Sequence, residues 1–192
     1  MYTPVAQFRE WLSEADKTEP SYANAATLCT VDENMRPHGR IILIKEIPDE
    51  GFVFYTNLTS AKGRQLKNNT AASLCLHWKT QERQVRIEGF AEQVPDAQAD
   101  AYFKGRPRGS KIGAWVSQQS EALESIETLA QEVKEHEDRF KKLEDIPRPP
   151  HWSGFLLKPD KIEFWQEGEF RLHKRELYTL QKGRWKKSLL YP

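Results

Sequence analysis

Three groups of cationic side chains carry most of the residues that could do chemistry in this chain. In the segment YFKGRPRGSK, Tyr102, Arg106 and Ser110 recur at intervals of four. A helix or near-helical turn would therefore bring a phenol, a guanidinium and a hydroxyl to one side. This trio suits a phosphate monoester, because arginine offers a forked donor and hydroxyls complete the shell around the oxygens. The alternatives are a basic solvated loop or a nucleic-acid patch.

The second group lies in the segment IEFWQEGEFRLHKR, which is typical of a strand, a turn at residues 167–168 and a second strand. In the second strand, period-two geometry places Arg171, His173 and Arg175 on one face. Three potential cations on one face repel each other unless an anion or a polar ligand lies there. A histidine between two arginines is therefore a better site candidate than a lone histidine, which is more often structural.

The third group is spread over two segments. Arg40 and Lys45 bracket four consecutive apolar residues in GRIILIK, which fits a buried strand whose charged ends emerge from the core. Ordinary charges at strand ends are an equally good interpretation. The segments FYTN and SAKG, between residues 54 and 63, combine hydroxyls with Lys62 and add a further candidate for anion binding.

Motifs for other chemistries are missing from the sequence. It has no GxGxxG or GxxxxGK[ST] loop, no Ser/His/Asp arrangement, no convincing carboxylate pair and no metal-ligand cluster. Phosphate would therefore be bound by side chains, and hydrolytic chemistry has little support. A protein that supplies binding groups rather than a nucleophile is typical of a cofactor enzyme.

The composition of the chain excludes several other classes of protein. The 192 residues carry 29 Lys and Arg against 28 Asp and Glu, so no global field attracts nucleic acid or an anionic membrane. No apolar run approaches the roughly 18 residues that span a bilayer, and the N-terminus lacks a signal peptide's apolar core. We expect a cytoplasmic protein with no nucleic-acid or membrane partner and no metal, whose Cys29 and Cys75 are buried free thiols.

The element pattern predicts one domain over residues 1–192, mainly β with flanking helices (α+β). A short helix is expected at about 5–15, then strands at about 24–31, 38–47, 51–57, 71–79 and 83–94, with a short helix at 60–69. A helical insertion follows at about 95–143, and antiparallel strands at about 154–190 with a turn at 181–183. The long helix of the insertion would carry Leu123, Ile126, Leu129, Val133 and Phe140 on one face. Such an order is typical of an antiparallel barrel with helices packed outside.

These motifs together resemble the pyridoxine/pyridoxamine 5'-phosphate oxidase family. The resemblance rests on RIILIK, FYTN, ERQVRIEG, YFKGRPRGSKIGAWVSQQS, IEFWQEGEFRLHKR and the final RWKKSLLYP, which occur in order over about residues 8–192. It implies an FMN-binding split β-barrel, a six-stranded antiparallel Greek key, with flavin sites at the interface of a two-fold homodimer.

The resemblance also implies a role for the polar residues of each motif. It assigns Lys45, Tyr102, Arg106 and Ser110 to the substrate phosphate, and Arg171 and His173 to the catalytic position at the substrate's pyridine ring. By their donors, Lys62 and the arginines suit the phosphate of FMN, and Gln84 suits the polar edges of its ring system. Around FMN the resemblance places Arg40, Ile41, Ile42, Leu43, Ile44, Lys45, Tyr55, Thr56, Lys62, Gln84, Gln119, Ser120, Trp165 and Arg175.

The implied reaction oxidises pyridoxine or pyridoxamine 5'-phosphate to pyridoxal 5'-phosphate. Hydride passes from the C4' carbon to flavin N5, and O2 reoxidises the flavin and yields H2O2. The chain departs from the family at Ala61 and Leu189, where an arginine is common, and at Lys174, where an acid is common. These departures leave two alternatives, a split-barrel flavoenzyme for another substrate and a non-catalytic protein that binds FMN or pyridoxal phosphate.

Overall fold

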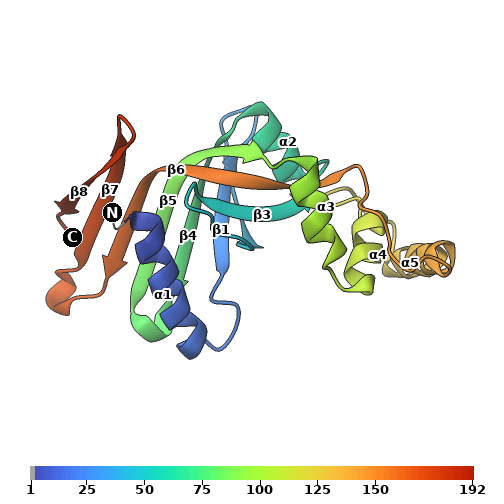
Figure 1. The fold of residues 1–192 in the computed structure, drawn as a ribbon, viewed down its shortest axis with the longest axis horizontal. Coiled ribbons are helices and arrows are strands. Elements are labelled where there is room, and N and C mark those ends of the chain that lie inside the picture. Colours follow the sequence, from blue (N-terminus) through green and yellow to red (C-terminus); the bar gives the residue numbers. More distant parts are fainter. Residues whose placement is uncertain (1–2) are drawn as a thin grey trace. The chain divides into compact units, whose positions relative to one another are not determined.

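One antiparallel sheet of eight strands forms the frame of the fold in the computed structural model (Figure 1). The strands follow the order β2-β1-β4-β5-β6-β7-β8, and β3 pairs with β6. The expected architecture, mainly β with flanking helices, is confirmed, although the sheet has two strands more than the six expected. The strands are β1 (Ala25–Val31), β2 (Pro37–Leu43), β3 (Phe52–Asn57), β4 (Ala71–Trp78), β5 (Arg83–Gln93), β6 (Trp152–Gln166), β7 (Lys174–Gln181) and β8 (Arg184–Leu190).

The structure describes residues 3–192, and contacts within the chain divide them into two units. Unit 1 comprises the residues up to 54 together with 65–92 and 156–192, and unit 2 comprises 55–64 and 93–155. The single domain expected from the sequence stays a prediction. The five helices are α1 (Pro4–Thr18), α2 (Ala61–Asn68), α3 (Asp96–Lys104), α4 (Arg108–Val116) and α5 (Ile126–Phe140).

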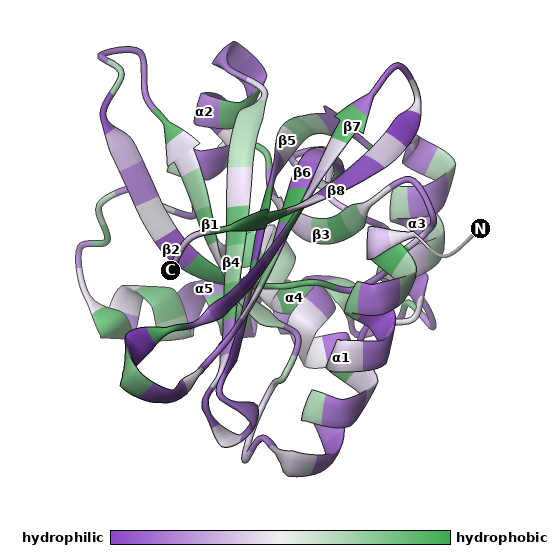
Figure 2. Ribbon diagram, turned by 90° about the vertical axis from the view of Figure 1, so that its left-hand side faces the viewer, coloured by the Kyte–Doolittle hydropathy of each residue, from purple (hydrophilic) through white to green (hydrophobic). Residues whose placement is uncertain are grey.

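The core of unit 1 lies between α1 and one face of the sheet. Alternate residues of β1 are buried, as period-two geometry requires for a strand with one face in a core. Helix α1 carries both hydrophobic and hydrophilic residues (Figure 2), and its buried Phe8 packs edge-on against Phe52 with ring centroids 4.8 Å apart. The helix begins where Thr3 accepts a hydrogen bond from the Ala6 amide and Pro4 occupies the first turn.

Unit 2 has its own apolar cluster, built between α4 and α5. Buried Ile112, Val116, Phe140 and Ile146 form its centre, and partly buried side chains of both helices pack against it. The apolar face of α5 begins later than the sequence pattern predicts. Ser125 caps α5, so Leu123 lies outside the helix, and Leu123 and Ile126 are exposed. The Ser125 side chain caps the helix, so residues before Ser125 belong to the preceding loop and cannot contribute to the apolar face of α5.

The C-terminal hairpin forms as the sequence predicts. Gln181 pairs with Arg184, and the two residues between them, Lys182 and Gly183, have φ values of 49° and 77°. Two consecutive left-handed residues are the conformation that a two-residue hairpin turn requires, and glycine adopts it without strain. The hairpin extends the sheet beyond β6.

Two further expectations concern the cysteines and the membrane. Cys29 and Cys75 are free thiols, as predicted, but both are half-buried rather than buried. Partial burial still raises the pKa of the Cys75 thiol. Between residues 3 and 192, no helix combines the length and the apolar character needed to cross a membrane.

Candidate functional site

A polar cluster forms in unit 2 where β3 ends and α2 begins. The Lys62 ammonium donates to Gln119 Oε1 at 2.5 Å and to Thr56 Oγ1 at 3.1 Å, and the Ala61 amide donates to Ser120 Oγ at 3.1 Å. The structure therefore brings together Thr56, Lys62, Gln119 and Ser120, four of the residues predicted to bind FMN. We call these four residues the Lys62 cluster.

The turn before α2 is held by Asn57. Its side-chain oxygen accepts from the Thr59 amide at 2.8 Å, and its side-chain nitrogen donates to the Ser117 carbonyl at 3.0 Å. A Cβ on Gly63 would come within 2.3 Å of the Leu58 carbonyl oxygen, so the first turn of α2 passes close to this loop only because residue 63 is glycine. These contacts fix the position of the backbone from which the Lys62 side chain extends.

The donors of the Lys62 cluster fit a phosphate group. An ammonium, hydroxyl groups and the amides of a helix N-terminus are the groups that bind phosphate in proteins. Ser120 has a φ of 79°, which is rare for a residue with a side chain and is common at functional sites. Ala61 has no side-chain donor, and nearby Arg64 is paired with Glu121 at 2.8 Å.

An aromatic stack forms a second cluster in unit 2. The rings of Tyr55 and Tyr102 lie parallel with centroids 3.9 Å apart, and the Trp152 ring is parallel to Tyr55 at 5.2 Å. The Arg106 guanidinium lies 4.7 Å from the centroid of the Trp152 ring, a cation–π arrangement. Burial lowers the pKa of Arg106. Tyr102 and Arg106 are both predicted to bind the substrate phosphate. The stack thus places both side chains near the Trp152 ring.

Ser110 lies on a different helix from Tyr102. Helix α3 ends at Lys104 and α4 starts at Arg108 after Pro107, so the three residues lie on two helices and the connection between them. Proline cannot continue a helix that precedes it, which breaks the four-residue spacing. The prediction that one helix or near-helical turn aligns all three was therefore wrong, and Ser110 is exposed.

Gly154 leaves the space that Tyr55 occupies. A Cβ at position 154 would lie 2.7 Å from Cε1 of the Tyr55 ring. We expect Gly154→Ala to displace Tyr55 and to lower the free energy of unfolding by about 1–3 kcal/mol, the usual cost of overpacking. Gly109→Ala is the matched control, because a Cβ there meets nothing within 4 Å. Denaturant unfolding of both variants checks the expectation, and equal stability would contradict it.

A third cluster lies on the sheet face of unit 1 that α1 leaves uncovered. Trp165 of β6 stands directly opposite Arg175 of β7, and the His173 ring lies 4.7 Å from the Trp165 ring. Arg175 Nε donates to the buried carboxylate of Glu163 at 2.7 Å. Half-buried Gln84 alternates in β5 with buried Val85 and so belongs to the same face. We call this set, with Trp165, His173 and Arg175, the Arg175 face.

Arg171 and His173 are not part of a strand, contrary to the sequence analysis. Phe170 and Arg171 have φ values of 55° and 64°, and β7 begins only at Lys174. Left-handed residues turn the chain, so period-two alternation cannot place Arg171 with Arg175. His173 is held instead by its ring nitrogen, which pairs with the Gly168 amide at 3.3 Å. The left-handed Arg171 is a second strained residue among the predicted site residues.

Strand β2 is less buried than its apolar run suggests. Arg40 donates to the side chains of Thr30 and Gln65, and burial lowers the pKa of Arg40. Ile41, however, is 65% exposed, Ile42 and Leu43 are half-buried, and only Ile44 is buried. The predicted buried strand was therefore wrong, because β2 ends the sheet order and has β1 as its one neighbour among the described strands. Lys45 follows β2 and is exposed.

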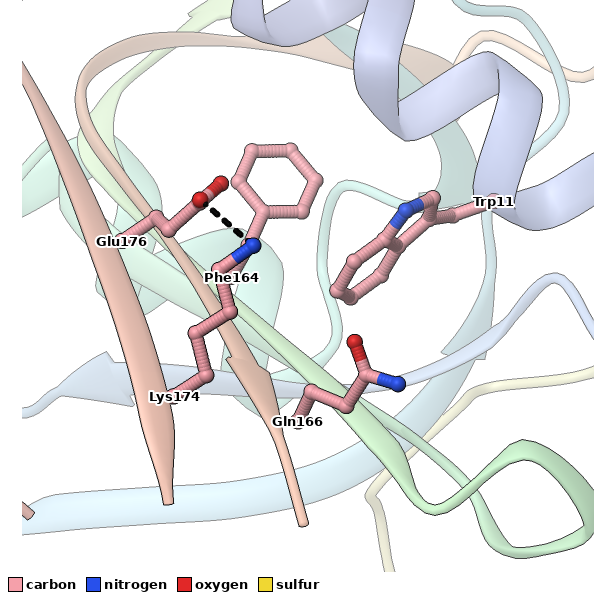
Figure 3. Close-up of a pocket in the computed structure, with 5 residues that line it drawn as sticks. All are labelled: Trp11, Phe164, Gln166, Lys174 and Glu176. Carbon is pink, nitrogen blue, oxygen red and sulfur yellow. Dashed lines mark ion pairs between the residues drawn. The ribbon is translucent and has the colours of Figure 1, made fainter. Parts of the chain in front are cut away.

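Lys174, one of the departures from the family, points to the face opposite Arg175. It lines a small pocket with Trp11, Phe164, Gln166 and Glu176, and its ammonium pairs with Glu176 at 2.9 Å (Figure 3). Alternation along β7 explains this placement, since residues 174 and 176 share the α1 side. The added charge therefore pairs with Glu176, a carboxylate that it shares with Lys187, and is directed away from the Arg175 face.

The Glu176 carboxylate should make the protein sensitive to acid. Burial raises its pKa, but hydrogen bonds from Lys174, Lys187 and Gln7 outweigh burial and leave the pKa below its usual value. A lowered folded-state pKa stabilises the fold above the unfolded-state pKa, and this stabilisation is lost as the pH falls through the folded-state value. We expect the free energy of unfolding to fall below pH 4.5 less steeply in Glu176→Gln than in the parent chain. Urea titrations at several acidic pH values measure this, and identical slopes would contradict the expectation.

Comparison with known proteins identifies the family. A model described as pyridoxamine 5'-phosphate oxidase matches residues 12–140, and one described as the pyridoxine 5'-phosphate oxidase C-terminal dimerisation region matches residues 152–192. The chain belongs to the pyridoxamine 5'-phosphate oxidase family. Proteins named pyridoxine/pyridoxamine 5'-phosphate oxidase from Rhizobium etli and Brucella canis are 50% and 49% identical to it over 191 residues. These alignments cover 98% of this chain and 92% and 94% of the relatives.

Solved structures confirm the fold expected for this family. PhzG from Burkholderia lata, solved in complex with tetrahydrophenazine-1-carboxylic acid, has a TM-score of 0.92 and 31% identity, with 98% of this chain and 92% of that chain covered. A pyridoxamine 5'-phosphate oxidase-related, FMN binding protein from Nostoc punctiforme has a TM-score of 0.79 and 17% identity, with both chains covered fully. The split-barrel prediction is confirmed.

Two residues of these clusters were missed by the sequence analysis. Trp152 stands beneath Arg106, and Glu163 binds Arg175. Glu163 left a signal in the sequence, because it interrupts the apolar run between Ile162 and Phe164, both of which are buried. Trp152 left none, since it follows a proline-rich connector and its partners come from distant segments.

Proposed function

We propose that the chain oxidises pyridoxine 5'-phosphate or pyridoxamine 5'-phosphate to pyridoxal 5'-phosphate, with FMN as cofactor, O2 as electron acceptor and H2O2 as product. The convergence of Thr56, Lys62, Gln119 and Ser120 into one phosphate-binding cluster carries this proposal. The two relatives that are about half identical over nearly the full length bear the name of this activity. Bound FMN would supply the two-electron acceptor for the oxidation.

The proposed roles divide the chain's own residues between cofactor and substrate. The Lys62 cluster and the Ala61 amide bind the FMN phosphate, and Gln84, Trp165 and Arg175 bind elsewhere on the cofactor, together with Tyr55 and residues 40–45. Tyr102 and Arg106 bind the substrate phosphate, with Lys45 and Ser110 as further donors. Arg171 and His173 hold the pyridine ring so that the reacting carbon is aligned. Hydrogen-bond donors at these positions act by orienting the substrate and by stabilising charge electrostatically.

The assembly and location complete the proposal. A match to a family region described as a dimerisation region supports a homodimer formed by residues 152–192. Exposed apolar side chains in this part of the chain, such as Leu172 and Leu189, supply surface for such a contact. We place the enzyme in the cytoplasm, as the sequence analysis predicts.

Product analysis tests the proposal. The purified protein, loaded with FMN, is mixed with pyridoxine 5'-phosphate in air, and aldehyde and peroxide are measured together. We expect one H2O2 for each pyridoxal 5'-phosphate formed. Aldehyde without peroxide, or no aldehyde, would contradict the oxidase assignment.

The structural similarity to PhzG favours one alternative, oxidation of a different ring substrate. PhzG shares the fold closely but is 31% identical to this chain, against 50% for the relative from Rhizobium etli. The departure at Lys174 gives no support to a changed substrate, because this side chain pairs with Glu176 on the α1 side of β7. Parallel assays with tetrahydrophenazine-1-carboxylic acid, the compound bound in the PhzG structure, separate the two activities.

A further inference from the structure

We propose that Glu163 is a positioning residue for the cofactor site, because it fixes the orientation of the Arg175 guanidinium. This inference rests on the proposed function, which places Arg175 against FMN. Glu163 itself has no proposed contact with cofactor or substrate. Its effect would reach the site through Arg175.

The geometry joins three neighbouring strands through one carboxylate. Glu163 in β6 accepts from Arg175 Nε of β7 at 2.7 Å through one oxygen and from Arg86 Nη1 of β5 at 3.4 Å through the other. Charged hydrogen bonds of this kind restrict an arginine more than a neutral contact does. Glu163 therefore divides its two oxygens between two guanidinium groups.

Burial shows that the carboxylate depends on these partners. The Glu163 side chain is 8% exposed, whereas Arg175 and Arg86 are 25% and 46% exposed. A buried carboxylate is stable only when it is paired, so the two guanidinium groups cover it and remain accessible themselves. In return, the hydrogen bond from Arg175 to Glu163 raises the pKa of Arg175. The arginine stays charged and is held in one place.

The remaining donors of Arg175 are directed by this pairing. Nε is engaged by Glu163, and Nη1 donates to the Tyr191 carbonyl at 3.0 Å. These two bonds fix the plane of the guanidinium, so its other edge faces a set direction. A preorganised donor loses less conformational entropy on binding than a free side chain does. Glu163 should therefore increase FMN affinity without touching FMN.

The test compares FMN affinity in Glu163→Gln with the parent chain. Glutamine keeps the size of the side chain but removes the charge that holds Arg175. We expect FMN to bind about tenfold more weakly, equivalent to losing one charge-assisted hydrogen bond. Titration of the FMN-free protein with FMN, followed by quenching of flavin fluorescence, measures the dissociation constant. Glu88→Gln is the matched control, since Glu88 pairs with Arg86 and Lys161 on the same face, and it should change affinity by less than about twofold.

A double-mutant cycle separates positioning from a general effect on folding. If Glu163 acts through Arg175, adding Glu163→Gln to Arg175→Ala should weaken FMN binding no further. Additive losses, or an unchanged affinity in Glu163→Gln alone, would overturn the inference. Thermal melting of the FMN-free variants shows whether each is folded, and Glu163→Asp with Glu88→Asp as its control replaces the pair if Glu163→Gln does not fold. If the parent chain bound no FMN at all, the proposed function would fail, which the same titration reveals separately.

Discussion

Replacing Lys62 with methionine is expected to weaken FMN binding about 10- to 100-fold. The ammonium lies among Thr56, Gln119 and Ser60, where its hydrogen bonds hold it at the N-terminus of α2. Methionine keeps the length of the side chain but removes the only formal positive charge in the Lys62 cluster. Loss of a charged hydrogen bond costs about 1.5–3 kcal/mol, and each 1.4 kcal/mol is a factor of ten in affinity. Titration with FMN measures the change.

Lys67→Met is the control for this prediction. Lys67 lies in the last turn of the same helix, is exposed, and has no place in the proposed site. The control should bind FMN like the parent chain. Equal losses in both variants would mean that net charge, and not the Lys62 cluster, sets the affinity. An unchanged affinity in Lys62→Met would remove the phosphate role of the cluster.

Replacing Arg171 with alanine is expected to slow flavin reduction by the substrate about 100-fold, the effect of losing one charged hydrogen bond of about 3 kcal/mol to the reacting molecule. FMN affinity should change little. Arg171 is exposed, lies outside β7 and adopts a left-handed backbone, so alanine removes its donors without opening a cavity. Rapid mixing of the FMN-loaded variant with pyridoxine 5'-phosphate under anaerobic conditions measures the rate.

Arg175→Ala should show the reverse pattern, with weak FMN binding and nearly normal reduction in the fraction that retains FMN. Arg184→Ala, an exposed arginine at the start of β8, controls for the lost charge. Because Arg175→Ala leaves the Glu163 carboxylate with a single partner, its melting temperature is measured as well. Parallel losses of affinity and rate in Arg171→Ala and Arg175→Ala would refute the division of roles.

Local signals were enough to predict most elements of the fold. The apolar spacing in α1, the β-branched runs of β1 and β3, and the glycine of the turn at residues 182–183 each favour one local conformation. The β7–β8 pairing also follows, because a two-residue turn forces antiparallel neighbours. Sheet order beyond neighbouring strands depends on long-range packing, which no local pattern contains.

The residue types singled out Thr56 and Lys62 as a candidate for anion binding, but Gln119 and Ser120 were predicted only through family resemblance. Thr56 and Gln119 lie 63 residues apart and meet through the Asn57 turn and the end of α4, which spacing cannot reveal. Periodicity arguments failed where the backbone leaves regular structure. Pro107 separates Arg106 from Ser110, and the left-handed Phe170 and Arg171 separate the site arginines.

Glu163 shows what sequence reasoning can recover about a site and what it cannot. A charged residue inside a buried run marks a position that needs a partner. The sequence does not identify that partner, because Arg86 and Arg175 lie 77 and 12 residues away and are chosen by strand register. Only the three-dimensional arrangement connects the carboxylate to the arginine of the proposed cofactor site.

Anaerobic bleaching of the flavin tests the central claim most directly. The FMN-loaded protein is mixed with pyridoxine 5'-phosphate in the absence of oxygen, and the visible absorbance of the flavin is followed. We predict that the yellow colour disappears and returns when air is admitted, with pyridoxal 5'-phosphate formed in proportion to the flavin bleached. Flavin that binds to the protein but keeps its colour in excess substrate would contradict the proposed oxidase.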